Sequence, residues 1–169
     1  MKKPDSLRAK LTAALPELAR DPNRLRMWIE QGQVRCHAGE EANGGNLNFL
    51  LEYTLVVVVE EWTKPQALIW IVLLDWLRIH QPALVTVAQS KTAIPFEADL
   101  ISEKAADIAI DLPLTEAVRV TKREDGGFDM QILAEPDPLF PDTVKMIPDG
   151  QPLKSIWIDG SQVVPDGPE

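Results

Sequence analysis

The residues best suited to covalent chemistry in this sequence are one cysteine and two histidines. Cys36 and His37 are adjacent in a segment that we expect to be extended, where neighbouring side chains point to opposite faces. Nucleophilic catalysis needs an oriented base within hydrogen-bond reach of the nucleophile, and this pair does not supply one. His80 falls at the end of an expected helix, where the helix dipole favours a cation. We therefore expect no catalytic residues.

Four carboxylates are spaced so that each pair shares one face of an extended chain. Asp107 and Asp111 flank Ala109, and Glu97 and Asp99 are arranged in the same way. Carboxylates that face one another bind hard metal ions, so a small metal-dependent hydrolase is one interpretation. The solvated face of an amphipathic sheet edge is the other. Since neither an EF-hand spacing nor a two-histidine motif is present, we favour the solvated face and expect no metal and no cofactor.

A polar loop at residues 39–46 contains the glycine-rich run Asn43-Gly44-Gly45. It lacks the Lys and Ser/Thr that follow a phosphate-binding loop, and Glu40 and Glu41 would repel phosphate. The loop is either simply flexible or contacts a partner. For the second case Glu40, Glu41 and Asn43 are interface candidates.

The bulk properties exclude several classes of protein. The 169 residues correspond to about one domain, and the net charge of −9 argues against binding to nucleic acid, including sequence-specific binding. A single cysteine excludes an intrachain disulfide and favours a reducing compartment. No apolar stretch follows Lys2-Lys3, so we expect no signal peptide. The purest apolar run, residues 67–74, is far shorter than the roughly 20 residues of a membrane span, so we expect no membrane partner.

The most apolar part of the chain lies between Asn48 and Gln81. Residues 49–60 are mostly apolar on both faces of an extended chain, as in a strand that is covered on both sides. Residues 67–79 then form an expected helix that apolar side chains nearly encircle. One sheet face cannot cover such a helix on every side, so we expect another subunit to bury the remainder.

Alternating apolar and polar residues predict the other strands. Ser6 is expected to cap a first helix, Gln31-Gly32 to form a turn between two short strands, and Pro113 to break a strand. Further strands are expected at 24–29, 34–37, 94–100, 107–114, 118–120 and 128–132, and residues 83–93 are expected to be a loop or a loop with a short helix. The predicted fold class is α+β: an antiparallel sheet of about six strands with one long helix packed on a face, an N-terminal helix and a C-terminal extended arm.

Five tryptophans are plentiful for a chain of this length. Trp70 and Trp76 are separated by about 240° around the expected helix, so they cannot both face the sheet. Trp28 falls on the polar side of its strand, and Trp62 follows the long strand. Tryptophan is enriched at subunit contacts, so all four are interface candidates; the alternative is that they belong to the core or its rim.

The chain divides into an expected α+β domain, residues 1–135, and an acidic, proline-rich arm, residues 136–169. The last 35 residues contain seven acidic and two basic side chains, a net charge of −5. A purely solvating tail lacks large apolar residues, and this arm retains several. We therefore expect it to contact its own core little and to dock on a neighbouring subunit or another protein, or alternatively to be a disordered tail with an incidental hairpin at Asp159-Gly160. The docking candidates are Leu139, Phe140, Ile156 and Trp157.

The order and spacing of several segments resemble the R-type tail completion proteins of contractile-tailed phages and related prophages or tailocins. The resemblance covers about residues 3–138. The segments that carry it are 3–8, 14–18, 21–25, 52–55, 76–82, 96–98, 112–116 and 118–120.

This resemblance implies a tail terminator. Such a protein forms a homo-oligomeric ring, usually a hexamer, on the last layer of the tail tube and sheath, where it stops tail growth and offers a docking surface for the head-side neck. The resemblance implies no catalytic residues. It also implies a location in the virion tail or neck, after assembly in the host cytoplasm. The alternatives from other classes are a small metal-dependent hydrolase and a bacterial α+β ligand-binding module.

Overall fold

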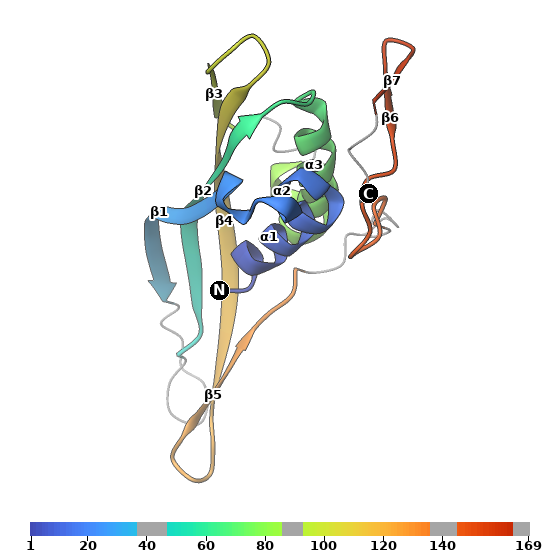
Figure 1. Ribbon diagram of the computed structural model, residues 1–169. Coiled ribbons are helices and arrows are strands. Elements are labelled where there is room, and N and C mark those ends of the chain that lie inside the picture. Colours follow the sequence, from blue (N-terminus) through green and yellow to red (C-terminus); the bar gives the residue numbers. More distant parts are fainter. Residues whose placement is uncertain (37–46, 86–92, 136–144, 164–169) are drawn as a thin grey trace.

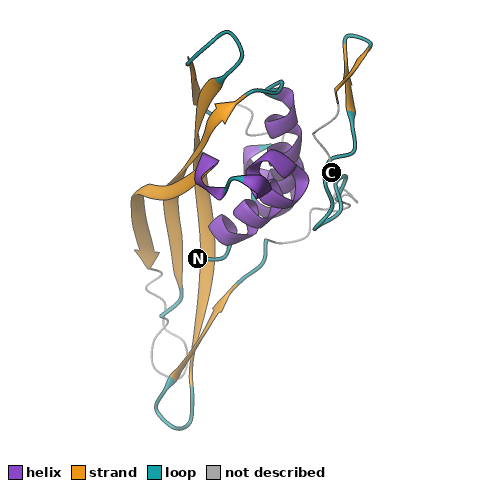
Figure 2. Cartoon of the chain, in the orientation of Figure 1, coloured by secondary structure: helices purple, strands orange, loops and turns teal. Residues whose placement is uncertain are grey.

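A layer of helices covers one face of an antiparallel sheet, and every described helix lies on that same side (Figures 1 and 2). The structure is a computed structural model that describes residues 1–36, 47–85, 93–135 and 145–163. The helical elements are α1 (Lys3–Ala14), α2 (Pro16–Arg20), the 3-10 turns η1 (Pro22–Arg24) and η2 (Pro82–Leu84), and α3 (Ala67–His80). The strands are β1 (Leu25–Cys36), β2 (Phe49–Trp62), β3 (Phe96–Leu100), β4 (Ala106–Lys122), β5 (Phe128–Ile132), β6 (Ile156–Ile158) and β7 (Ser161–Val163). The predicted α+β class is confirmed.

The sheet is built around β2 and β4, which pair along most of their lengths. The strand order is β1-β2-β4-β3, and β5 pairs with another part of β4. Val57 pairs with Ile110 and Val59 with Ile108, and all four side chains are buried. Their alternation places one apolar face of each strand under the helices. The core joins that face to the inward faces of α1 and α3, with Leu7, Leu11, Leu68, Val72, Leu73 and Leu77 among its members.

The first strand is longer than the sequence predicts. The turn expected at Gln31-Gly32 is wrong, because β1 runs without a break from Leu25 to Cys36 and pairs with β2 throughout. The register shifts between Ile29 and Gln31, which marks a bulge rather than a turn. Gly32 then pairs with Tyr53, and a Cβ at Gly32 would lie 3.5 Å from the tyrosine Cβ. A side chain at this position would meet only ordinary van der Waals contacts, so Gly32 marks neither a reversal of the chain nor a close approach that demands glycine.

Pro113 also fails to break its strand. It pairs with Thr54 in the middle of β4, where β4 has neither β3 nor β5 beside it. The Asp111 N–H points to this edge and donates to Pro95 O, and the Thr115 N–H donates to Gln81 Oε1. Because backbone groups alternate between the two sides of a strand, a residue at position 113 directs its backbone nitrogen to this same edge. No described strand pairs with β4 at that point of the edge, so proline, which lacks an N–H, loses no sheet hydrogen bond.

The helical layer corrects two further expectations. Helix α1 begins at Lys3, so Ser6 lies inside it and accepts a hydrogen bond from Trp76 Nε1 at 3.0 Å instead of capping the helix. Helix α3 is buried by its own chain on more sides than one sheet provides, because α1 packs against it within the helical layer. Only Ile71 and Leu74 remain as exposed large apolar side chains on α3. The surplus that favoured a second subunit is therefore much smaller than predicted.

Candidate assembly surfaces

The face of the sheet turned away from the helices is not covered by any of the described elements (Figure 2). Near its centre, Val56 is flanked by Trp28 on β1 and Asp111 on β4. Trp28 is 46% exposed, whereas Val56 is buried beside it. A large half-exposed aromatic side chain on an otherwise uncovered sheet is typical of a contact surface.

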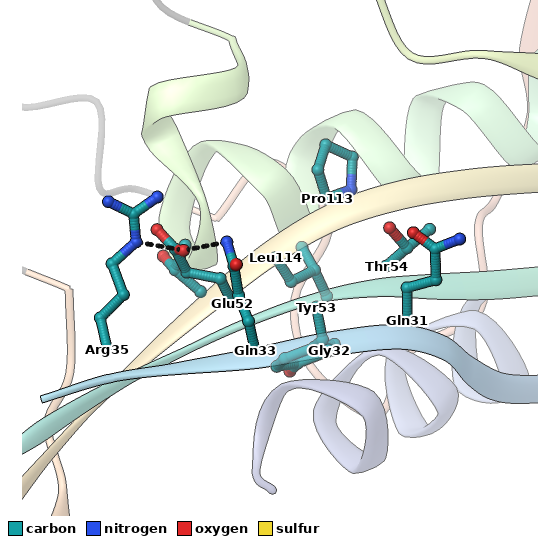
Figure 3. A pocket seen from close by; sticks show the side chains of 10 residues that line it. Gln31, Gly32, Gln33, Arg35, Glu52, Tyr53, Thr54, Pro113 and Leu114 are labelled. Atoms are coloured by element: carbon teal, nitrogen blue, oxygen red, sulfur yellow. Dashed lines mark hydrogen bonds and ion pairs between the residues drawn. The ribbon is translucent and has the colours of Figure 1, made fainter.

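A hollow of about 460 Å³ crosses β1, β2 and the middle of β4 (Figure 3). On its rim, the Glu52 carboxylate accepts hydrogen bonds from Arg35 Nε and Gln33 Nε2, each at 2.6 Å. These charges satisfy one another, and Thr54 and Pro113 line the rest of the hollow. An open, shallow site with paired charges suits contact with a protein surface better than enclosure of a small substrate.

The exposed edge of the sheet is β1. It has twelve residues, pairs with β2 alone among the described strands, and presents Ile29 and Val34 as exposed apolar side chains. A long edge strand with exposed apolar residues is a template for pairing with another chain unless it is blunted. The bulge beside Ile29 blunts one point of this edge and leaves the rest open.

The tryptophan candidates separate into two groups. Trp62 and Trp76 are buried within the subunit at 4% and 2% exposure, so neither contacts a partner directly from this fold. Trp70 is half-buried and packs edge-on against Phe96 with ring centroids 5.0 Å apart. Trp28 remains an exposed candidate on the sheet.

Of the candidates from the arm and the polar loop, the structure describes only those on the β6–β7 hairpin. Trp157 is 67% exposed on the β6–β7 hairpin, and Ile156 packs partly against the core. Phe140 and Leu139 lie outside the described residues. The loop candidates Glu40, Glu41 and Asn43 also lie outside them, so their role as contacts stays a prediction.

The side chains considered for chemistry are not assembled into a site. Cys36 is exposed at the end of β1, and His37 lies outside the described residues. His80 stacks on Trp76 at 4.8 Å between centroids, and burial lowers the pKa of its imidazole. Glu97, Asp99, Asp107 and Asp111 share the uncovered sheet face by register. Among the described residues no three His, Cys, Asp or Glu side chains are grouped to hold a metal ion.

The sequence profile of the family described as P2 phage tail completion protein R (GpR) matches residues 1–136. The chain belongs to this family. It is also 35% identical over 147 residues to the "Tail completion protein R" of Escherichia phage P2, an alignment that covers 86% of this chain and 91% of that protein. No solved structure matches the chain.

Membership of the tail completion family confirms the resemblance inferred from residue spacing and places the chain among phage tail proteins, not enzymes. Each helix in the described part of the chain is too short or too polar to cross a membrane. The residues that match the family include the helical layer, the uncovered face of the sheet and its β1 edge. The match ends just after β5, the last strand of the main sheet.

Inside the family core, a buried carboxylate joins β4 to the start of α1. Glu116 is 1% exposed, and its Oε1 accepts hydrogen bonds from the backbone N–H of Lys2 at 3.0 Å and of Lys3 at 2.7 Å. The same oxygen accepts the Tyr53 hydroxyl at 3.0 Å. Helix α1 has no side-chain cap of its own, so a carboxylate from a distant strand supplies one and opposes the positive end of the helix dipole.

This arrangement predicts an unusual tyrosine titration. Burial, and then the neighbouring negative charge of Glu116 and its hydrogen bond, raise the pKa of Tyr53 far above its ordinary value near 10. A raised pKa means stability that is present below pH 10 and is lost as the pH rises beyond it. Tyr53 is the single tyrosine of the chain, so its phenolate absorbance can be followed directly. We expect no ionisation at pH 10 in the folded protein and about half ionisation after addition of urea. Equal titration in both states would contradict this assignment.

Beyond the family match, residues 145–153 form a strap across the helical layer. The Asp75 carboxylate accepts the N–H groups of Met146 at 2.9 Å and Ile147 at 3.2 Å. Lys10 Nζ lies 3.0 Å from Asp75 Oδ2 and donates to the carbonyl of Ile147, whose side chain is buried in the core. Contrary to expectation, this part of the arm contacts its own core firmly. The Ile147 side chain is buried there, and the strap backbone supplies hydrogen-bond partners to the buried Asp75 and Lys10, which would otherwise be costly to bury.

Proposed function

We propose that this protein is a tail terminator, which assembles as a homo-oligomeric ring, a hexamer, on the last layer of the tail tube and sheath. The ring ends tail growth and presents a docking surface to the head-side neck. Assembly takes place in the host cytoplasm before the ring becomes part of the virion tail. The proposal starts from the family membership of residues 1–136 and from the surfaces that this region leaves uncovered.

The observation that carries the proposal is the β1 edge together with the uncovered sheet face. A subunit of a closed ring needs two different surfaces that meet between neighbours. Strand β1 supplies one such surface, with an open edge and exposed Trp28, Ile29 and Val34. The opposite edge of the sheet is divided between β3 and β5 and presents exposed Phe96 and Met130. Contact between unlike edges of successive copies generates a ring when the rotation closes.

A lysine on the β1 edge tests this proposal. We expect Val34→Lys and Trp28→Lys to lower the fraction of ring-sized species in native mass spectrometry and to leave phage with incomplete tails. Lysine on an edge strand discourages pairing because a neighbouring strand would have to desolvate its charge. Since Val34 is 57% exposed, its replacement should change the free energy of unfolding by about 0.5 kcal/mol or less.

Ala9→Lys is the matched control, because it adds the same charge at an exposed position of α1 in the helical layer. It should assemble and complete tails as the unmodified protein does. Negative-stain images of tails carrying a labelled copy should show the label at one end only. Assembly of both β1 variants at the level of the control would overturn the use of this edge, and label along the tail shaft would overturn the terminator role.

A further inference from the structure

Polar groups of α1 and α3, which we call the α1–α3 groove, bind the strap through its backbone, while the Ile147 side chain is buried in the core. Asp75 accepts two successive N–H groups, and Lys10 donates to the carbonyl that follows them. Near the end of α1, the Ala14 carbonyl accepts the N–H of Leu153 at 2.9 Å. All these groups of the groove belong to the helices, so the site is complete without the chain that leads to the strap. The same segment of a second copy would meet identical partners.

The path to the strap is longer than the subunit itself requires. Glu135, at the end of the family core, is bound by Lys3, while the strap is bound by Lys10 on the same face of α1. Those two lysines are separated by about 10 Å along the helix axis at 1.5 Å per residue. The nine residues 136–144 join the two points, and a chain of that length can reach about 35 Å when extended. The connection is therefore long enough for the strap to leave its own subunit.

The strap also ends in a surface that its own subunit leaves uncovered. The β6–β7 hairpin (Figure 1) pairs only with itself in the described chain, although its Ile156 and Val163 pack partly against the core. Its Trp157 is 67% exposed, although it lies only a few residues beyond the anchored Leu153. A strap that lies on a neighbour would carry this aromatic side chain to the junction between two subunits.

We propose that in the assembled ring the strap, residues 145–153, lies in the α1–α3 groove of the neighbouring copy, so that successive subunits are fastened by exchanged segments. This inference rests on the proposed ring. The exchange keeps the buried Lys10–Asp75 pair satisfied in every subunit and adds a link between chains at little cost, since the same contacts are formed in both arrangements.

The test uses two full-length single-cysteine proteins in a Cys36→Ser background. One carries Ala14→Cys in the groove and the other Leu153→Cys in the strap, at positions joined by a backbone hydrogen bond. The two proteins are mixed, assembled into rings and oxidised. We expect a disulfide between the two chains, seen as a shift from 18.8 kDa to twice that mass on a non-reducing gel. A single chain that carries both cysteines reports the opposite case, an internal disulfide with no change in mass.

Each outcome decides the matter. Rings that form with a disulfide between the mixed chains support exchange. Rings in which only the double-cysteine chain forms a disulfide, and forms it within one chain, overturn the exchange. That result would still be consistent with the proposed ring. Rings without either disulfide also overturn it, because the strap then occupies no groove. If no ring forms on tails or in solution, with or without the cysteines, the proposed function itself fails.

Discussion

Asp75→Ala is expected to lower the free energy of unfolding by about 3–5 kcal/mol, the cost of removing one partner from a buried ion pair. Asp75 and Lys10 are 4% and 7% exposed, and the substitution leaves the lysine ammonium buried without its carboxylate. It also leaves the N–H groups of Met146 and Ile147 without an acceptor. Urea unfolding followed by circular dichroism measures the loss. Asp99→Ala, at an exposed carboxylate of β3, is the control and should stay within about 0.5 kcal/mol.

The same carboxylate predicts a pH dependence. Burial alone would raise the pKa of Asp75, but the hydrogen bonds from Met146 and Lys10 outweigh it and hold the pKa below its ordinary value. A lowered pKa contributes stability above the unfolded value near 3.9 that is lost as the pH falls through the folded value. The difference between the unmodified protein and Asp75→Ala should therefore be largest near neutral pH and shrink in acid. A difference that stays constant from pH 7 to pH 3 would argue against an ionised Asp75.

The double variant Lys10→Met/Asp75→Leu separates charge from packing. Replacing both members of a buried pair by apolar side chains of similar size is often neutral or stabilising. We therefore expect it to be more stable than Asp75→Ala, with the remaining deficit coming from the unpaired strap N–H groups. Should the double variant prove no better than Asp75→Ala, the loss would come from the strap contacts alone and not from the orphaned lysine.

The sequence predicts best those features that depend on local alternation. The apolar runs of the sequence predict both β2 and α3, because burial imposes a period on consecutive residues. Trp28 was correctly placed on the polar face of its strand for the same reason. Failures occurred where a distant partner decides the local outcome. Gly32 and Pro113 are turn and breaker residues in isolation, yet β2 holds both in continuous strands.

The buried polar contacts were missed altogether, since each joins elements far apart in the sequence. One signal was available. Lys3 and Lys10 fall on the same stripe of α1 as Leu7, Leu11 and Ala14, and all five are buried. Charged residues on a core-facing stripe predict buried partners, because an unpaired charge there would be too costly. The partners themselves, Asp75, Gln81 and Glu135, could not be identified without the fold.

Glu116→Ala is the second substitution for which we expect a large effect. It removes the acceptor of the Tyr53 hydroxyl and of the first two N–H groups of α1, at a cost of about 3 kcal/mol or more in the free energy of unfolding. Glu116→Gln keeps an acceptor oxygen and should cost less, although its amide N–H groups would replace an oxygen that has no partner in the structure. Glu97→Ala, on exposed β3, is the control for loss of a glutamate and should be close to neutral.

The titration of Tyr53 distinguishes the specific role of Glu116 from a general loss of packing. Burial would still raise the pKa of the phenol in Glu116→Gln, but the contribution of the neighbouring negative charge would be gone. We therefore expect the folded Glu116→Gln variant to ionise its tyrosine at a lower pH than the unmodified protein and still above the unfolded chain. A tyrosine titration unchanged by Glu116→Gln would show that burial alone sets the pKa, and that this carboxylate acts on α1 and not on Tyr53.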